Sequence, residues 1–252
     1  RSSDLIEKER QLTLFLLGKM LAVFLYGKKS LTSERTFTRI KKVNNRLQER
    51  SDFMGDTKEA ILTTALQLFA GNGYEAVSVS EIAGALGMTK GALYKHYKNK
   101  RDIFDHILIR MEQRDAEQAG NCEMPEGTLE EMEEQYRDIS MEQFFTYCKE
   151  QFTYWTEDTF AASFRRMLTL EQFRSEEMQK LYQQYLVAGP MEYVADLFTS
   201  SGVRNARAQA VRLYATMFFF YSVYDGAEDK ESAKKQFQEA LKELEKSICK
   251  EW

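Results

Sequence analysis

Apolar side chains recur every three or four positions along most of this 252-residue chain, the spacing that places them on one face of an α-helix. Toward the front, these repeats predict short helices at about residues 57–70, 78–86, 89–97 and 99–111. Further on they predict helical faces over about residues 141–155, 164–168, 178–186, 191–198, 205–224 and 237–248. Only two prolines interrupt the chain, so we expect an all-α fold.

Turn and capping signals mark the ends of the first helices. Asp56, with Glu59 three residues later, approximates a capping box that would start the first helix. Residues 71–73, Gly-Asn-Gly, should end it, because glycine and asparagine tolerate the left-handed conformation found at helix C-termini. Ser78 and Glu81 form a full S-x-x-E capping box for the second helix.

A tight turn at Gly87 separates the second helix from the third, which should open at Thr89. Leu93 and Tyr97 are four residues apart and should point into the core, which leaves the opposite side of the third helix facing outward. Asn99 is expected to cap the fourth helix. This arrangement is typical of a helix-turn-helix that puts its second helix into the major groove of DNA.

Charge is unevenly distributed along the chain. Residues 1–53 hold 12 Lys/Arg and 6 Asp/Glu, residues 54–105 hold 6 of each, and residues 106–252 hold 17 and 27. The acidic segment 106–252 would repel nucleic acid, so any contact with DNA must come from the N-terminal part of the chain. Five basic residues cluster there with no acid among them: Lys90, Lys95, Lys98, Lys100 and Arg101. Taken alone, such a cluster is more often a solvated face.

Residues 60–105 strongly resemble the DNA-binding head of TetR-family transcriptional regulators. The resemblance is carried by the run AILTTALQLFAGNGYEAVSVSEIAGALGMTKGALYKHYKNKRDIF, and its most specific part is TKGALYKHYKNK. It implies a three-helix helix-turn-helix head followed by a larger helical bundle for ligand binding and dimerisation. We therefore divide the chain into an N-terminal extension (1–53), a DNA-binding domain (54–105) and a ligand-binding and dimerisation domain (106–252).

The resemblance also implies roles for individual residues of the head. Tyr94 and Lys100 correspond to residues that contact DNA phosphates, and Ser78 and Ser80 lie where the second helix meets the DNA backbone. The candidate base readers and groove contacts are Thr89, Lys90, Gly91, Lys95 and His96. The alternative for His96 is simple exposure, and for Tyr94 a place in the core. Tyr97 departs from the phenylalanine commoner in the family, but its ring can fill the same core position.

The second half of the chain is rich in aromatic residues and methionine, which can form either a plain core or the walls of a cavity between helices. Phenolic hydroxyls would supply the few polar contacts, and Arg165 and Arg166 are the possible counter-ions. We expect a hydrophobic or aromatic effector. The candidate ligand-binding residues are Phe152, Trp155, Phe164, Met167, Tyr182, Tyr185, Tyr214 and Phe218.

Residues 205–224 are apolar nearly all round, so this helix must be covered on both sides. The last predicted helix covers part of it, and a second copy of the chain could cover the rest. Two helices from each subunit would then form a four-helix bundle about a two-fold axis. The resemblance implies the same homodimer.

Residues 1–53 are expected to lie outside the functional fold, as an upstream extension or artefact. The alternatives are an extra helix packed on the body and a basic arm that touches DNA. The apolar run at residues 12–26 is too short to span a bilayer and lacks a signal-peptide cleavage site. Three widely spaced cysteines indicate a reducing compartment and argue against a disulfide framework or a zinc site.

These observations favour a cytoplasmic, ligand-responsive regulator of transcription, acting as a repressor that binds a pseudo-palindromic operator as a homodimer. Two other classes remain as alternatives. An enzyme is disfavoured because the sequence shows neither a Ser/His/Asp or Cys/His set nor a glycine-rich phosphate loop, and no cofactor or metal is expected. A membrane-tethered regulator would have to use residues 12–26.

Overall fold

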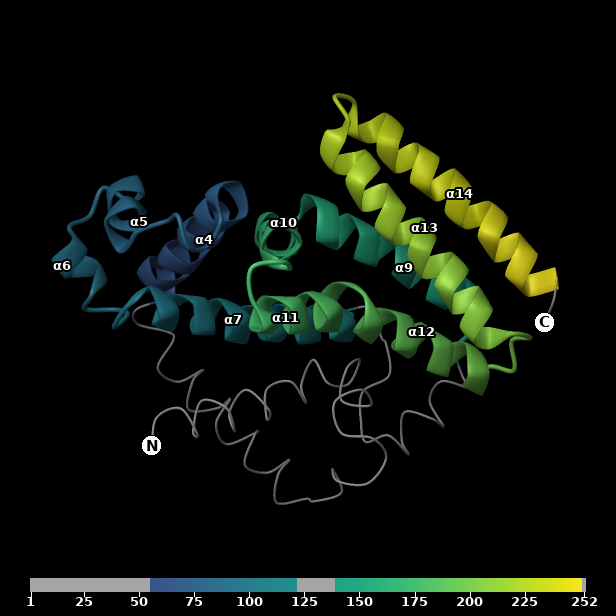
Figure 1. Cartoon of the computed structure of the whole chain (residues 1–252). Helices are drawn as coiled ribbons and strands as arrows, with labels where there is room; N and C mark the ends of the chain where they lie inside the picture. The colour runs from purple at the N-terminus through teal and green to yellow at the C-terminus, as the bar shows by residue number, and fades with distance from the viewer. Residues whose placement is uncertain (1–54, 122–138, 251–252) are drawn as a thin grey trace, which may run out of the picture.

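The computed structural model describes residues 55–121 and 139–250, and all ten regular elements within these ranges are helices. The front of the chain forms α4 (Gly55–Asn72), α5 (Val79–Ala85), α6 (Lys90–Leu93) and α7 (Lys100–Asn121), as Figure 1 shows. The body consists of α9 (Met141–Glu157), α10 (Thr159–Glu171), α11 (Glu176–Leu186), α12 (Ala188–Ser200), α13 (Ala206–Gly226) and α14 (Lys230–Lys250). The predicted all-α fold is confirmed. The extension over residues 1–53 falls outside the described residues.

Most of the predicted helix ends are correct. Ser78 caps α5 through a capping box with Glu81, and Asn99 Oδ1 accepts a hydrogen bond of 2.8 Å from the Asp102 backbone N–H at the start of α7. Gly73 and Gly87 have positive φ angles of 88° and 64°, the left-handed region that each chain reversal requires. These local signals are sufficient to set the three-helix layout of the head.

The predicted start of the first helix is wrong. Because α4 already includes Gly55, Asp56 lies inside the helix and is not its N-cap. Glu59 instead accepts a hydrogen bond of 3.0 Å from Arg110 Nε on α7. A tertiary ion pair therefore uses the carboxylate that a local cap would have needed.

The third helix is shorter than predicted. Its α-helical part ends at Leu93, and the chain continues as a tighter turn in which Lys95 N–H donates to Ala92 O and His96 N–H donates to Leu93 O, at 3.2 and 2.9 Å. Such i→i+3 bonds are typical of a helix that tightens at its end. Leu93 and Tyr97 are both buried as predicted, and the Tyr97 hydroxyl donates to Lys58 O at 3.4 Å.

Helix α7 crosses the proposed boundary at residues 105/106 without a break (Figure 1). Its apolar face packs against α4 in the head and α10 in the body. One continuous hydrophobic cluster accordingly joins the two parts, from Ile61 in α4 to Leu186 in α11. The head is thus attached to the body through a shared core as well as through the chain.

A second hydrophobic cluster holds α9, α12, α13 and α14 together. At its centre the ring of Phe152 lies between Tyr221 and Phe237, with ring centroids 5.5 and 3.8 Å away. Helix α11 ends at Leu186 and α12 begins at Ala188, with Val187 between them, and Pro190 lies in the first turn of α12. Proline is accepted there because a first-turn N–H has no helical partner to lose.

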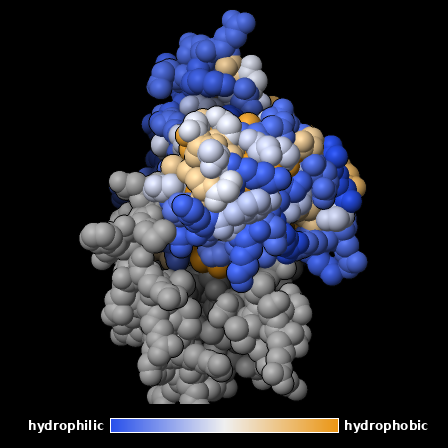
Figure 2. Space-filling view, turned by 90° about the vertical axis from the view of Figure 1, so that its left-hand side faces the viewer, coloured by the Kyte–Doolittle hydropathy of each residue, from blue (hydrophilic) through white to orange (hydrophobic). Residues whose placement is uncertain are grey.

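None of the helices within the described ranges is long and apolar enough to cross a bilayer. Viewed from the end that carries the head, the described surface is largely hydrophilic, with small pale and orange patches between polar side chains (Figure 2). Residues 12–26, on which a membrane tether would depend, lie outside the described part of the chain.

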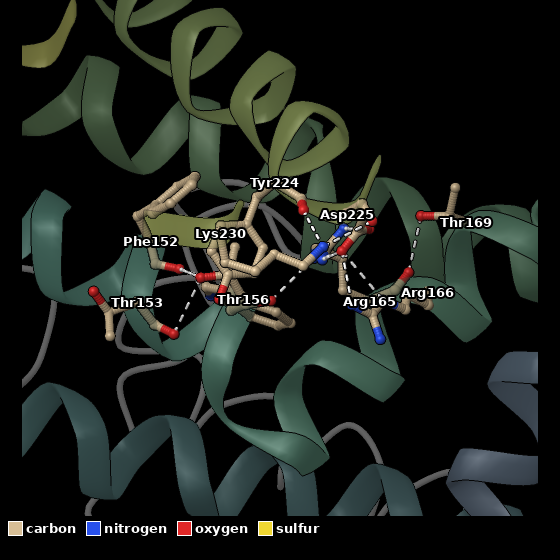
Figure 3. A network of polar contacts seen from close by, with 10 residues as sticks. Phe152, Thr153, Thr156, Arg165, Arg166, Thr169, Tyr224, Asp225 and Lys230 are labelled. Atoms are coloured by element: carbon tan, nitrogen blue, oxygen red, sulfur yellow. Dashed lines mark hydrogen bonds and ion pairs between the residues drawn. The ribbon is translucent and has the colours of Figure 1, made fainter. Parts of the chain in front are cut away.

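A charged network inside the body joins α10 to the end of α13 (Figure 3). The Arg165 side chain is 6% exposed; it donates two hydrogen bonds of 2.8 Å to the Asp225 carboxylate and a third, of 3.0 Å, to Trp155 O. Arg166 binds the same carboxylate from the solvent side, at 2.8 Å. Burial alone would raise the pKa of Asp225, but the hydrogen bonds from the two arginines outweigh it and lower the pKa.

Replacing Asp225 with asparagine should lower the free energy of unfolding at pH 7 by about 2–4 kcal/mol, because it leaves the Arg165 guanidinium buried without a counter-charge. Glu192→Gln is the matched control; it removes the partner of Arg207, which is 65% exposed, and should cost less than about 1 kcal/mol. Urea unfolding followed by circular dichroism measures both changes.

The difference between wild type and Asp225→Asn should also depend on pH. Since the folded-state pKa of Asp225 is lowered, its stabilisation is fully present above the unfolded value of 3.8 and disappears as the pH falls through the folded value. Equal losses for the two variants at pH 7, or a difference that does not shrink below about pH 4, would contradict this role.

Candidate functional site

The outer face of α5 and α6 carries the predicted contacts of the head. Ser78 and Ser80, at the start of α5, are both exposed, and Ser78 Oγ accepts a hydrogen bond of 3.2 Å from Glu81 N–H. Thr89 caps α6 in the same way, its Oγ1 accepting from Ala92 N–H at 3.2 Å. The beginnings of both helices, with their hydroxyl groups and backbone N–H groups, therefore lie at the surface.

Three of the predicted contacts lie together on the exposed side of α6 and the turn after it. Lys90 Nζ is 5.7 Å from the centre of the Tyr94 ring, Tyr94 is 43% exposed, and Lys95 is exposed beside it. This exposure rules out a core position for Tyr94. At Gly91 an added Cβ would meet only Thr89 Oγ1, at 4.0 Å, so the fold itself does not require a glycine there.

His96 has a less open position than its neighbours. It is half-buried, and its Nδ1 is buried without a hydrogen-bond partner among the described residues. Only part of the His96 ring is therefore accessible from the exposed surface that carries Lys95. Contact with a base or phosphate stays a prediction for this residue.

The side chain of Lys100 makes most of its contacts within the protein. Its ammonium group donates to the carbonyl oxygens of Tyr74 and Glu75, at 2.9 and 3.2 Å, and lies 4.4 Å from the centre of the Tyr74 ring. The Glu75 carboxylate is 3.7 Å away. Lys100 therefore ties the start of α7 to the loop between α4 and α5, a structural role that the sequence did not indicate.

The acidic residues nearest this face are engaged in local contacts. The carboxylate of Glu81 accepts from Ser78 N–H at 2.6 Å, and this bonding with Ser78 lowers the pKa of Glu81. Asp102 accepts from Lys98 N–H at 2.7 Å. The ammonium groups of Lys90, Lys95 and Lys98 project from an exposed surface, where they favour a polyanion.

Two polar contacts hold the head against the body. The guanidinium of Arg101 forms a pair of hydrogen bonds with the Glu177 carboxylate on α11, at 2.8 and 2.7 Å. The carboxylate of Glu171, at the end of α10 and 1% exposed, accepts from Tyr74 N–H at 3.0 Å. The orientation of the head is therefore fixed by α10 and α11 as well as by α7.

A cavity lies inside the body between α7, α9, α11, α12 and α13. Its volume is about 70 Å³. Its walls are mainly aromatic and aliphatic, with one carboxylate and one carboxamide. The lining residues are Asp115, Phe144, Tyr147, Cys148, Gln151, Trp155, Tyr185, Leu186, Pro190, Tyr193, Val194, Tyr214, Met217 and Tyr221.

Three of the eight predicted ligand-binding residues line this cavity: Trp155, Tyr185 and Tyr214. Phe152, Phe164, Met167 and Tyr182 are buried among other side chains of the two cores. Phe218 lines a different hollow of about 410 Å³, together with Arg165, Arg166 and Asp225. The helical faces were predicted correctly. The sequence does not show which turn of each face borders the cavity, because that depends on how the helices cross.

The sequence reasoning missed most of the cavity wall. Tyr147, Cys148 and Gln151 precede Trp155 at helical spacing, and Tyr221 follows Tyr214 two turns later, so extending each stripe would have found them. Asp115 gave a weaker signal, because it is a polar residue that continues the apolar face of α7. Burial raises the pKa of its carboxyl to about 8, although the neighbouring Tyr154 hydroxyl and Arg114 act in the opposite direction.

Comparison with known proteins adds to this geometry. Residues 61–107 match the family described as bacterial regulatory proteins, tetR family. The HTH-type transcriptional regulator AcrR of Shigella flexneri is 46% identical over 52 residues, which are 21% of this chain and 24% of AcrR. The HTH-type transcriptional repressor BepR of Brucella suis is 44% identical over 55 residues, or 22% and 26% of the two chains. The match thus spans about a quarter of the length of these curated relatives.

The likeness of the whole structure extends further than the likeness of sequence. The fatty acid degradation regulator FadR from Bacillus halodurans superposes with a TM-score of 0.50 at 18% identity, over 74% of this chain and 95% of FadR. This similarity establishes the fold of the body but not its ligand. The sequence likeness to tetR-family regulators is therefore carried by residues 61–107, in α4 to α7, and the body behind them shares its fold with FadR.

Proposed function

We propose that this protein regulates transcription by binding DNA through the head, with α6 in the major groove. The observation that carries this proposal is the exposed surface of Thr89, Lys90, Gly91, Tyr94 and Lys95, which follows the capped helix α5 and contains no acidic residue. Lys95, which the sequence placed among the base readers and groove contacts, would hold the phosphate backbone together with Tyr94, while Thr89 and Lys90 reach the base edges. BepR, a relative over the head, is named a repressor, and repression is the mode we propose here.

The proposed regulator acts as a homodimer formed through α13 and α14. These two helices lie side by side at one end of the body (Figure 1), and α13 presents an apolar strip to solvent. Within that strip Val211 is 49% exposed and Phe219 is 62% exposed. The exposed Ala208 precedes Val211 by three positions, and the exposed Ala215 lies between Val211 and Phe219, four positions from each. A second copy packed on this strip would bring two heads to half-sites about 34 Å apart on a pseudo-palindromic operator.

The proposed effector binds in the cavity of the body. Asp115 lies on the cavity wall and belongs to helix α7. The same helix begins at Lys100, in the head. A ligand that favours a different position of α7 would favour a different spacing of the two heads. It can shift the population only by the ratio of its affinities for the DNA-competent and DNA-incompetent states. Since the enclosed space is small, binding of a larger effector would also require the helices to separate.

Lys95→Ala should weaken binding to a duplex from the region upstream of the protein's own gene. The lost phosphate contact should also reduce the slope of log K against log salt by about 1. Lys180→Ala on α11 is the control, because it removes the same charge from an exposed site in the body. Fluorescence anisotropy at several salt concentrations measures both; indistinguishable slopes for the two variants would rule out Lys95 as a DNA contact.

Lys100→Met should reduce the stability of the fold even without DNA. It removes two charge-assisted hydrogen bonds to the loop at Tyr74 and Glu75, worth about 1.5–3 kcal/mol together. Lys98→Met, two residues away with an exposed side chain, should change stability by less than about 0.5 kcal/mol. Urea unfolding compares the two, and equal stabilities would leave phosphate contact as the role of Lys100.

Phe219→Glu should convert the dimer into a monomer, because it places a charge on each side of the two-fold interface. Phe173→Glu is a stringent control: Phe173 is 88% exposed, more than Phe219, but lies between α10 and α11. Light scattering after size exclusion gives the mass of each variant. A dimeric Phe219→Glu variant, or a monomeric Phe173→Glu variant, would place the interface elsewhere.

A further inference from the structure

The wall of the body cavity contains an acidic group that the proposed function does not yet use. Asp115 lies on α7 three residues after Glu112, on the side of the helix that continues the buried face of Leu108 and Met111. It is the single charged residue among the described residues that line the cavity. A carboxyl group on a largely apolar cavity wall is costly to ionise unless a positive charge lies close to it.

Within residues 55–121 and 139–250, no Lys, Arg or His lies at ion-pair distance from Asp115. Its neighbour Arg114 is the nearest candidate in sequence, but the guanidinium is turned to Asp158, with which it forms a short ion pair, and lies 3.8 Å from Glu59. Arg165, the buried arginine of the body, is bound to Asp225.

The rest of the wall is suited to a cation. Seven aromatic side chains surround the space: Phe144, Tyr147, Trp155, Tyr185, Tyr193, Tyr214 and Tyr221. The hydroxyl of Tyr185 donates to the Glu112 carboxylate at 3.3 Å, and that of Tyr214 donates to Leu186 O. Since these hydroxyls bind within the protein, the rings contribute mainly their π-faces and edges, and an aromatic face attracts a cation.

We infer that the cavity binds an organic cation, with its charge beside Asp115 and its apolar groups against the aromatic rings. The inference rests on the proposed function, because it names the chemical class of the effector. An anionic effector would meet a carboxylate and no basic residue on the described wall. A neutral effector would bring no opposite charge to the Asp115 carboxyl, which already lies beside the Tyr154 hydroxyl. This narrows the hydrophobic or aromatic effector expected from the sequence to one that carries a positive charge.

The binding should be linked to the protonation of Asp115. The charged and titratable groups around it are Glu112 and Arg114 on α7, Tyr154 on α9, Asp158 at the start of α10, Tyr185 on α11 and Tyr221 on α13. With the Asp115 pKa raised to about 8, the empty cavity holds a neutral carboxyl at pH 7. A cation binds the ionised form better, so its binding releases a proton and tightens as the pH rises toward 8.

Phenyltrimethylammonium and its uncharged isostere tert-butylbenzene test the inference, because they differ in charge but hardly in shape. Binding to the full chain can be followed by calorimetry and by the fluorescence of Trp155. The wild type should bind the cation at least about tenfold more tightly than the hydrocarbon at pH 8. Between pH 6 and pH 8 its affinity for the cation should rise by about tenfold per pH unit, flattening near 8, with no such change for the hydrocarbon.

Asp115→Asn should abolish the preference for the cation and its pH dependence, while binding of tert-butylbenzene persists. Glu117→Gln is the matched control: it removes one negative charge from the same helix at a side chain that is 63% exposed, and it should behave as the wild type. Retention of the preference in Asp115→Asn, a preference of the wild type for the hydrocarbon, or no binding of either compound would overturn the inference.

The proposed function is tested separately by anisotropy with the upstream duplex. If the cation binds through Asp115 but leaves DNA affinity unchanged, the assignment of the cavity stands and ligand control of DNA binding fails. If the duplex binds but the cation does not, the DNA-binding role stands and the cation inference fails.

Discussion

The continuity of α7 is the constraint on which the rest of this structure depends. The same 22-residue helix begins beside the surface that we propose to face DNA, supplies Ile103, Phe104 and Ile107 to the shared core, and ends beyond Asp115 on the cavity wall. Lys100 and Asp115 are separated by fifteen residues, or roughly 22 Å along a straight helix. The two positions are therefore joined by one continuous helix, with no loop between them.

The contacts on either side of α7 determine how a displacement of this helix would reach the head. Arg101 binds Glu177 on α11, and Glu171 on α10 accepts from Tyr74 N–H in the loop that Lys100 also holds. Helix α10 in turn places Phe164 against Tyr185, a residue of the cavity wall, with ring centroids 4.9 Å apart. The head thus has two mechanical connections to the cavity, one through α7 and one through α10 and α11.

The head could be predicted from sequence in detail because its signals are local. The capping box of Ser78 and Glu81, the reversal at Gly87 and the cap at Asn99 each depend on residues within three positions of one another. Prediction failed where a distant partner intervened. Glu59 is held by Arg110, 51 positions away, and Lys100 by backbone carbonyls 25 and 26 positions away. Such partners follow from the packing of α7 on α4, which periodicity does not specify.

The body shows a different limit, since its helices were predicted but its cavity was not. Phe152 and Trp155 lie on one face of α9, yet Phe152 stacks between Tyr221 and Phe237 while Trp155 borders open space. One turn of helix decides between core and wall, and that choice depends on the crossing of α9 with α13. Asp115 was missed for a related reason: a search for apolar repeats ends at Met111, where the buried face of α7 becomes polar. Acidic residues on a buried helix face do not stabilise the fold. We therefore favour ligand binding as the reason for the acidic residues on this part of α7.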